Sequence, residues 1–195
     1  CQQLGRLVRY ADDAVVLCRN KADAEESLRR LGLIMEWLSL KLHPNKTRIV
    51  ELGLGRQGFV FLGCHLRIVL SHFKRREYLF RWPSPRAMKR IRGSVRELTD
   101  RRCWAGLQDF RQVVEVLNPR LRGWGNYFRT GNASWKFQQV DRYVNERLVR
   151  LLRHVRSWRR RPFSLHEWSP ARFAADFGLH RLVGTIRYPG QVNAT

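Results

Sequence analysis

The stretch LVRYADDAVVLC, residues 7–18, places two adjacent carboxylates, Asp12 and Asp13, between two runs of residues that favour β-strands. Because Asp is common in turns, the stretch predicts a hairpin whose tip carries both acids. Two carboxylates at the end of a stiff hairpin repel each other unless a cation lies beside them. Hard oxygen ligands of this kind suit Mg²⁺ in phosphoryl transfer. Ordinary turn chemistry is the alternative, and the pair alone leaves both interpretations open.

The chain around this acidic pair is strongly basic. Its 195 residues include 38 Lys and Arg against 16 Asp and Glu, a net charge of +22. Such an excess favours a polyanionic partner, because each neutralised phosphate releases counterions. Nucleic acid is the leading candidate and an anionic membrane surface is the second. Residues 86–161 contain 20 basic and 6 acidic side chains, net +14, so we expect the polyanion to bind there.

The composition also narrows the class of protein. A hydrophobic content of 44% predicts a globular chain with a real core. No apolar run approaches the roughly 20 residues that span a bilayer, so we expect no membrane insertion and a cytoplasmic location. The four cysteines form no C-x-x-C pair, which argues against a zinc site and against a disulfide framework.

The pattern after the hairpin predicts a mixture of a helix and further strands. Asp23 is a candidate N-cap for a helix whose apolar stripe, from Ala24 to Leu42, covers the hairpin. A strand is expected at residues 48–52. The stretch GFVFLGCHLRIVL, residues 58–70, predicts one strand, and EYLFRW, residues 77–82, predicts its hairpin partner across a basic turn.

The second half of the chain has helical periodicity. Ser84 followed by Pro85 is a strong helix start. Asn118-Pro119 is expected to divide the helical region, and a long helix is expected from Trp135. A last helix is predicted from Ser169-Pro170 to Gly178. The sequence therefore predicts an α+β chain with domains at 1–82 and 83–161 and a short C-terminal extension at 162–195.

Four segments, in order, resemble one protein family. YADD, residues 10–13, resembles the catalytic motif of group II intron reverse transcriptases. LKLHPNKTRIV, residues 40–50, is similar to the motif that follows it, and FVFLGCHL, residues 59–66, resembles the primer-grip hairpin. The region from Leu117 to Arg153 resembles the maturase-specific region, also called domain X or the thumb. The resemblance implies a partial reverse-transcriptase palm, an antiparallel sheet with a helix, followed by an α-helical thumb.

The resemblance also implies RNA-directed DNA synthesis and assistance to intron splicing, with Mg²⁺ as the cofactor. An RNA template with a DNA primer, and the intron RNA, would be the partners. The implied roles are Mg²⁺ ligation and catalysis by Asp12 and Asp13, protonation of the leaving pyrophosphate by Lys46, and contact with the primer by Tyr10, Phe61, Leu62 and Gly63. Lys46 could equally be a solvated loop lysine, and the primer-grip residues are also ordinary strand residues.

Basic residues of the second half are the candidates for RNA binding. The expected contacts are Arg122, Arg147, Arg150 and Arg153. A solvated helix face is the alternative for the arginines of the long helix. Trp124, Tyr127 and Phe128 could stack on unpaired bases, but helix packing is the favoured interpretation for most of them.

The family pattern has parts that this sequence does not contain. The fingers and the first palm motifs, including a further metal-binding aspartate, would precede residue 1. We therefore expect a C-terminal fragment that is inactive as a polymerase alone. A partner chain that supplies the N-terminal half is one way to complete it. Two alternatives remain open: a splicing-only RNA-binding maturase, and a reverse transcriptase of the retron or CRISPR-associated kind.

Overall fold

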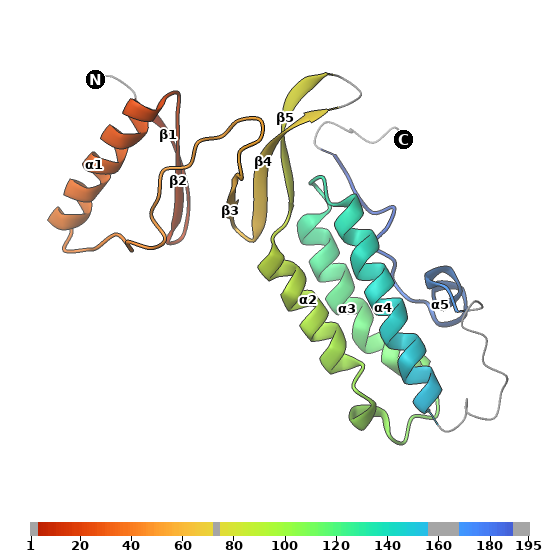
Figure 1. The fold of residues 1–195 in the computed structure, drawn as a ribbon. Coiled ribbons are helices and arrows are strands. Elements are labelled where there is room, and N and C mark those ends of the chain that lie inside the picture. The colour runs from red at the N-terminus through yellow and green to blue at the C-terminus, as the bar shows by residue number, and fades with distance from the viewer. Residues whose placement is uncertain (1–3, 72–74, 156–167, 189–195) are drawn as a thin grey trace, which may run out of the picture. The chain divides into compact units, whose positions relative to one another are not determined.

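The computed structural model describes residues 4–71, 75–155 and 168–188. The chain divides into two compact units, residues 1–79 and 80–195 (Figure 1). The first is built mainly from strands and one helix, and the second is built mainly from helices. The structure therefore confirms a mixed α and β chain with small antiparallel sheets.

The N-terminal unit begins with the predicted hairpin. Strand β1, Gly5–Tyr10, pairs antiparallel with β2, Asp13–Cys18, and Tyr10 lies opposite Asp13. The turn consists of two residues, Ala11 and Asp12, and Ala11 takes a positive φ of 48°. Asp13 belongs to the first position of β2 and not to the turn itself, but both acids remain at the tip.

Helix α1, Lys21–Trp37, packs against this hairpin as expected, but it ends five residues before Leu42, the predicted limit of its apolar stripe. Its N-cap is Asn20 and not Asp23 as predicted, because the Asn20 side chain accepts a hydrogen bond from the backbone N–H of Asp23 at 2.8 Å. The Asp23 carboxylate instead accepts from Asn20 Nδ2 at 2.9 Å. Asn20 thereby satisfies a backbone N–H of the first helical turn that has no partner within the helix, as N-cap residues generally do.

Two strand predictions in this unit were wrong. Residues 48–52 form no strand, because within the described residues no neighbouring segment pairs with them. The single strand predicted for residues 58–70 is a hairpin, β3, Phe59–Phe61, and β4, Cys64–Ser71. Its turn residues, Leu62 and Gly63, have φ of 48° and 73°. Two successive positive φ values give the tight turn that matches strand twist, and Gly adopts them without strain.

Strand β5, Arg76–Pro83, completes the three-stranded sheet in the order β3-β4-β5, as the hairpin prediction for residues 77–82 required. The last residues of β5 are tied to the helical unit through the loop that follows helix α3. Asn132 donates its backbone N–H to Arg81 O at 2.7 Å, and Arg81 donates back to Asn132 Oδ1 at 3.3 Å. A Cβ at Gly131 would collide with the Arg81 carbonyl, so this loop needs glycine there.

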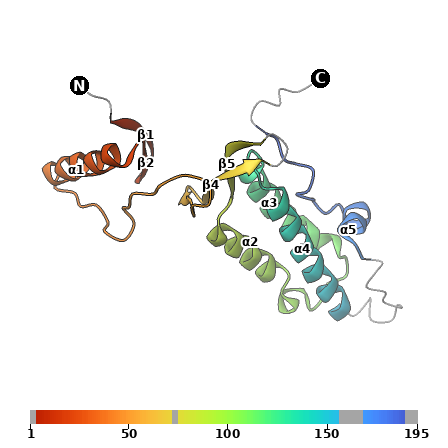
Figure 2. The ribbon, with the colours of Figure 1, turned by 45° about the horizontal axis from the view of Figure 1, so that its top comes forward.

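The helical unit is a three-helix bundle. Its helices are α2, Pro85–Leu98, α3, Arg111–Phe128, and α4, Ser134–His154, and they lie side by side in both ribbon views (Figures 1 and 2). A short 3-10 helix, η1, Arg101–Trp104, follows α2. Ser84 caps α2 as predicted. The core combines aliphatic and aromatic side chains, and its fully buried members include Val95, Val113, Leu117, Leu121, Phe137, Val140, Leu148 and Leu152. Helical spacing predicts an apolar face on α4, and its described members are buried: Val144, Leu148, Leu151, Leu152 and Val155. Trp158, the last predicted member, lies outside the described residues.

The expected break at Asn118-Pro119 was wrong, because α3 runs through Pro119. Proline in a helix interior removes one backbone hydrogen bond. Asn118 is fixed by long-range contacts that sequence periodicity does not show. Its Nδ2 donates to Gly178 O at 2.9 Å, and its Oδ1 accepts from the backbone N–H of His180 at 2.7 Å. These two hydrogen bonds tie α3 to residues 178–180 at this position.

A C-terminal strap, residues 178–185, crosses the bundle after helix α5. Helix α5, Pro170–Phe177, begins after the Ser169 cap and ends at left-handed Gly178, as predicted. The Asp141 carboxylate on α4 accepts from the backbone N–H groups of Leu182, at 3.1 Å, and Val183, at 3.0 Å. Burial raises the pKa of Asp141, and the two N–H donors oppose that rise.

Among the described residues, no helix combines the length and hydropathy that crossing a bilayer requires.

Candidate nucleic-acid interface

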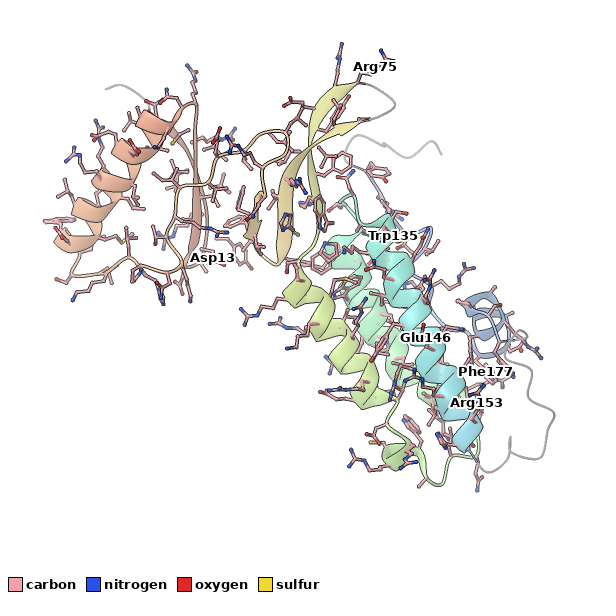
Figure 3. All side chains as sticks on the ribbon, viewed as in Figure 1. Asp13, Arg75, Trp135, Glu146, Arg153 and Phe177 are labelled. Atoms are coloured by element: carbon pink, nitrogen blue, oxygen red, sulfur yellow. The ribbon has the colours of Figure 1, made fainter. Side chains whose placement is uncertain are left out.

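The acidic tip of the first hairpin is open to solvent. Asp12 and Asp13 are both exposed, and Tyr10 is 67% exposed. Figure 3 shows Asp13 at the turn end of the hairpin. Arg9 Nε donates to the carbonyl of Ala11 at 2.9 Å, which supports the tight turn. Within the described residues, no group of three or more His, Cys, Asp or Glu side chains gathers here or elsewhere.

The other residues predicted for primer binding and catalysis lie in turns and strands of the same unit. Lys46 is exposed in a turn where its backbone N–H donates to His43 O at 3.1 Å. Phe61 ends β3, while Leu62 and Gly63 form the turn into β4. Lys46 thus has the exposure that a loop lysine in either role would have, and its role stays a prediction.

Arg147 occupies a different place from the other arginines expected to bind RNA. Its Nε donates to Thr99 Oγ1 at 3.0 Å, and its Nη2 donates to the carbonyls of Thr99, at 3.2 Å, and Arg96, at 3.3 Å. These carbonyls lie at the C-terminus of α2, where backbone oxygens lack helical partners and a cation is favourable. Arg147 therefore ties the end of α2 to α4.

Arg122, Arg150 and Arg153 are exposed on the bundle. Arg153 lies near the C-terminal end of α4 (Figure 3). Burial of the imidazole and, to a smaller extent, the charge of Arg122 lower the pKa of His180 on the strap. The exposure of Arg122, Arg150 and Arg153 is compatible with phosphate contact, and phosphate contact stays a prediction for all three arginines.

The aromatic residues near the end of α3 divide between core and surface. Phe128 is buried, and Trp124 lies 4.9 Å from it and 5.4 Å from Phe137, ring centroid to ring centroid. The packing interpretation thus describes Phe128 and Trp124. Tyr127 is 58% exposed although its ring packs edge-on against Phe128.

The structure also forms a basic groove that the sequence reasoning missed. The groove lies between α2 and α4 and has a volume of about 480 Å³. Its cations are Lys89, Arg92 and Arg96 from α2 and Lys136 from α4, with Gln139 and Tyr143 on the α4 wall. The Arg92 guanidinium lies 5.9 Å from the centroid of the Tyr143 ring, in cation–π geometry. The helical spacing of the basic residues on α2 was a signal available in the sequence. It predicts a groove only once α2 and α4 are known to be neighbours.

Comparison with protein families identifies the helical unit. Residues 88–168 match the model of the group II intron, maturase-specific domain. This part of the chain is similar to a maturase-specific domain. The resemblance seen from Leu117 to Arg153 is thereby confirmed. The match begins earlier, within α2, and spans α3 and α4. No curated protein matched the chain.

The basic groove lies within the part of the chain that matches the maturase-specific domain. Every residue that lines it, apart from Pro85, falls within the matched range. The acidic hairpin tip lies outside that range.

Proposed function

We propose that this chain is the C-terminal region of a group II intron-encoded protein and that its maturase domain binds the intron RNA to assist splicing. The match over residues 88–168 carries the proposal. The charge distribution supports it, because the segment 86–161 has a net charge of +14 and a polyanion is the natural partner. Arg122, Arg150 and Arg153 are the arginines we propose as phosphate contacts, since all three are exposed.

The parent protein would also be an RNA-directed DNA polymerase that copies an RNA template from a DNA primer. Support comes from the YADD motif at the tip of a two-residue hairpin, with both carboxylates exposed. In this proposal Tyr10, Phe61, Leu62 and Gly63 contact the primer, and Lys46 protonates the leaving pyrophosphate. A further chain, or a preceding segment, would supply the remaining palm.

The residues at the tip fit a magnesium site of the usual kind. Mg²⁺ is commonly held by one or two carboxylates, with water and substrate phosphates filling the other positions. Asp12 and Asp13 supply two adjacent exposed carboxylates, and no third acidic, histidine or cysteine side chain joins them in the described part of the chain. When bound there, the ion would activate the primer hydroxyl and stabilise the leaving oxygen.

The RNA-binding proposal is tested by measuring the affinity of the whole chain for a group II intron RNA across a salt series, with an unrelated structured RNA of equal length as control. We expect tight binding that weakens steeply with salt and a preference for the intron RNA. Equal affinity for both RNAs would reduce the proposal to general RNA binding. Absence of binding at low salt would overturn it.

A separate experiment tests the polymerase proposal. In a protein that includes the fingers and first palm motifs, Asp12→Asn should abolish primer extension and leave RNA affinity almost unchanged, because the carboxylate would bind metal and not phosphate. Primer extension near the level of the unaltered protein would contradict the assignment. A splicing-only maturase is the second candidate, and such a protein would promote splicing without extending primers in either form.

A further inference from the structure

The groove between α2 and α4 concentrates positive charge that is not neutralised within the described structure. Lys89, Arg92, Arg96 and Lys136 line it together, and no carboxylate lines it. Some of the described cations elsewhere have acidic partners, as Arg102 has in Asp100 at 3.0 Å and Arg172 has in Asp176 at 3.2 Å. None of the four groove cations has such an ion pair among the described residues. Four like charges in one groove repel each other, so the arrangement favours an anionic occupant.

The spacing of the charges indicates an extended anion. Lys89, Arg92 and Arg96 follow one another at three and four residues, which places them on one face of α2. The stripe runs for roughly 10 Å, because seven residues rise by about 1.5 Å each. Lys136 stands on the opposite wall. A row of this length suits a chain of phosphates better than a single phosphate group.

The position of the Tyr143 ring favours binding of the nucleic-acid backbone in the groove over stacking of the ring on a base. The Arg92 guanidinium lies over the ring of Tyr143, so that this ring face holds the cation. At the far end, Arg147 ties the last turn of α2 to α4 through Arg96 O and Thr99. The two walls are therefore held together while the side chains of the cations remain in the groove.

We propose that this groove, lined by Lys89, Arg92, Arg96 and Lys136, binds the phosphodiester backbone of RNA independently of base sequence. The inference rests on the proposed RNA-binding function and assigns a specific surface to it. Arg147 acts as a positioning residue that keeps the end of α2 against α4. Arg150 lies seven residues after Tyr143 on α4, hence on nearly the same helix face, and would extend the track beyond Arg147.

The test compares two pairs of substitutions in the whole 195-residue chain. The groove pair is Arg92→Gln with Arg96→Gln. The control pair is Arg111→Gln with Arg120→Gln, two exposed arginines of α3 that do not line the groove. Both pairs remove the same charge from surface positions. Circular dichroism and thermal unfolding establish that each variant is folded before binding is compared.

The probes are a fluorescein-labelled RNA duplex of arbitrary sequence, oligo(U), and a DNA duplex of the same sequence as the RNA. For the groove pair we expect weaker RNA binding and a plot of log affinity against log salt that is flatter by about 1.4 to 1.8, since each phosphate contact contributes roughly 0.7 to 0.9. The loss should be similar for a second RNA sequence. The control pair should change the slope by less than half of that amount.

The outcomes separate this inference from the function on which it rests. If the unaltered chain binds none of the RNA probes at low salt, the proposed RNA-binding function fails. If it binds RNA and the groove and control pairs lose affinity equally, RNA binding stands and the groove assignment is overturned. If the groove pair weakens binding to the DNA duplex alone, the groove is a DNA site and the RNA assignment is overturned.

Discussion

Leu182 of the C-terminal strap packs directly against Gly125 of α3. A Cβ atom added at position 125 would lie 2.6 Å from Leu182 Cδ2, closer than two carbon atoms can approach. Leu182 is fully buried, so its methyl groups have little room to withdraw. The absence of a side chain at position 125 is therefore what lets the strap lie against the bundle.

Replacement of Gly125 tests this contact, with Gly123 on the same helix as the matched control. A Cβ at Gly123 meets nothing within 4 Å, so Gly123→Ala should stabilise the protein by about 0.5 to 1 kcal/mol through helix propensity. Gly125→Ala gains the same term but overpacks the core, at a cost of about 1 to 3 kcal/mol. We expect it to be less stable than Gly123→Ala by that amount in urea unfolding. Equal stability of the two variants would mean that the strap does not rest on Gly125.

Asp141, which accepts hydrogen bonds from the strap, should make the stability of the protein depend on pH. Its pKa is raised in the folded state above the ordinary value of 3.8, so folding favours the protonated carboxyl. This contribution to stability is fully present below the ordinary value and is lost as the pH rises through the raised value. Asp141→Asn does not titrate and leaves one of the two strap N–H groups without an oxygen acceptor, which costs about 1 to 3 kcal/mol.

The measurement is the free energy of unfolding of both proteins between pH 4 and pH 7. We expect the advantage of the unaltered protein over Asp141→Asn to be larger near pH 4 than at pH 7. His180, whose lowered pKa opposes folding as the pH falls, is present in both proteins and largely cancels in the difference. An advantage that grew toward neutral pH would contradict the raised pKa of Asp141.

Substitution of Arg147 and of Arg150 should have different effects on stability, because Arg147 has a structural role and Arg150 is an exposed candidate for RNA binding on the same helix. Arg147→Gln removes three hydrogen bonds at the end of α2 and should lower the free energy of unfolding by about 1 to 3 kcal/mol. Arg150→Gln alters an exposed side chain and should stay within about 0.5 kcal/mol. Thermal unfolding monitored by circular dichroism compares the two. Equal, small effects would show that Arg147 does not hold α2 in solution.

Pro119 is a further test, because it lies inside α3. Pro119→Ala restores a backbone N–H that can reach the carbonyl of Glu115 and removes a cost of about 3 kcal/mol in a helix interior. It also returns up to about 1 kcal/mol of entropy to the unfolded chain. The first effect is the larger, so we expect stabilisation by about 1 to 2 kcal/mol in urea unfolding. Unchanged or lower stability would mean that the native helix is already relaxed around the proline.

Local sequence signals predicted the elements with strong ends or strong periodicity. The hairpin at Asp12, the start of α2 after Ser84 and the caps of α5 at Ser169 and Gly178 are set by residues close in sequence. The apolar face of α4 followed from helical spacing, because that spacing places residues on one side of a helix whatever packs there. The maturase resemblance was also visible from residues alone and is confirmed by the family match.

The tertiary structure decided what depends on neighbours distant in sequence. α3 continues through Pro119 inside a packed bundle, although the dipeptide Asn118-Pro119 locally favours a break. Residues 48–52 have strand propensity but no strand to pair with among the described residues. Arg147 is indistinguishable from Arg150 in the sequence, and only the position of the end of α2 makes it a structural residue. The basic groove likewise exists because packing brings α2 beside α4, and a periodic pattern fixes the faces of a helix but not which helix will lie against them.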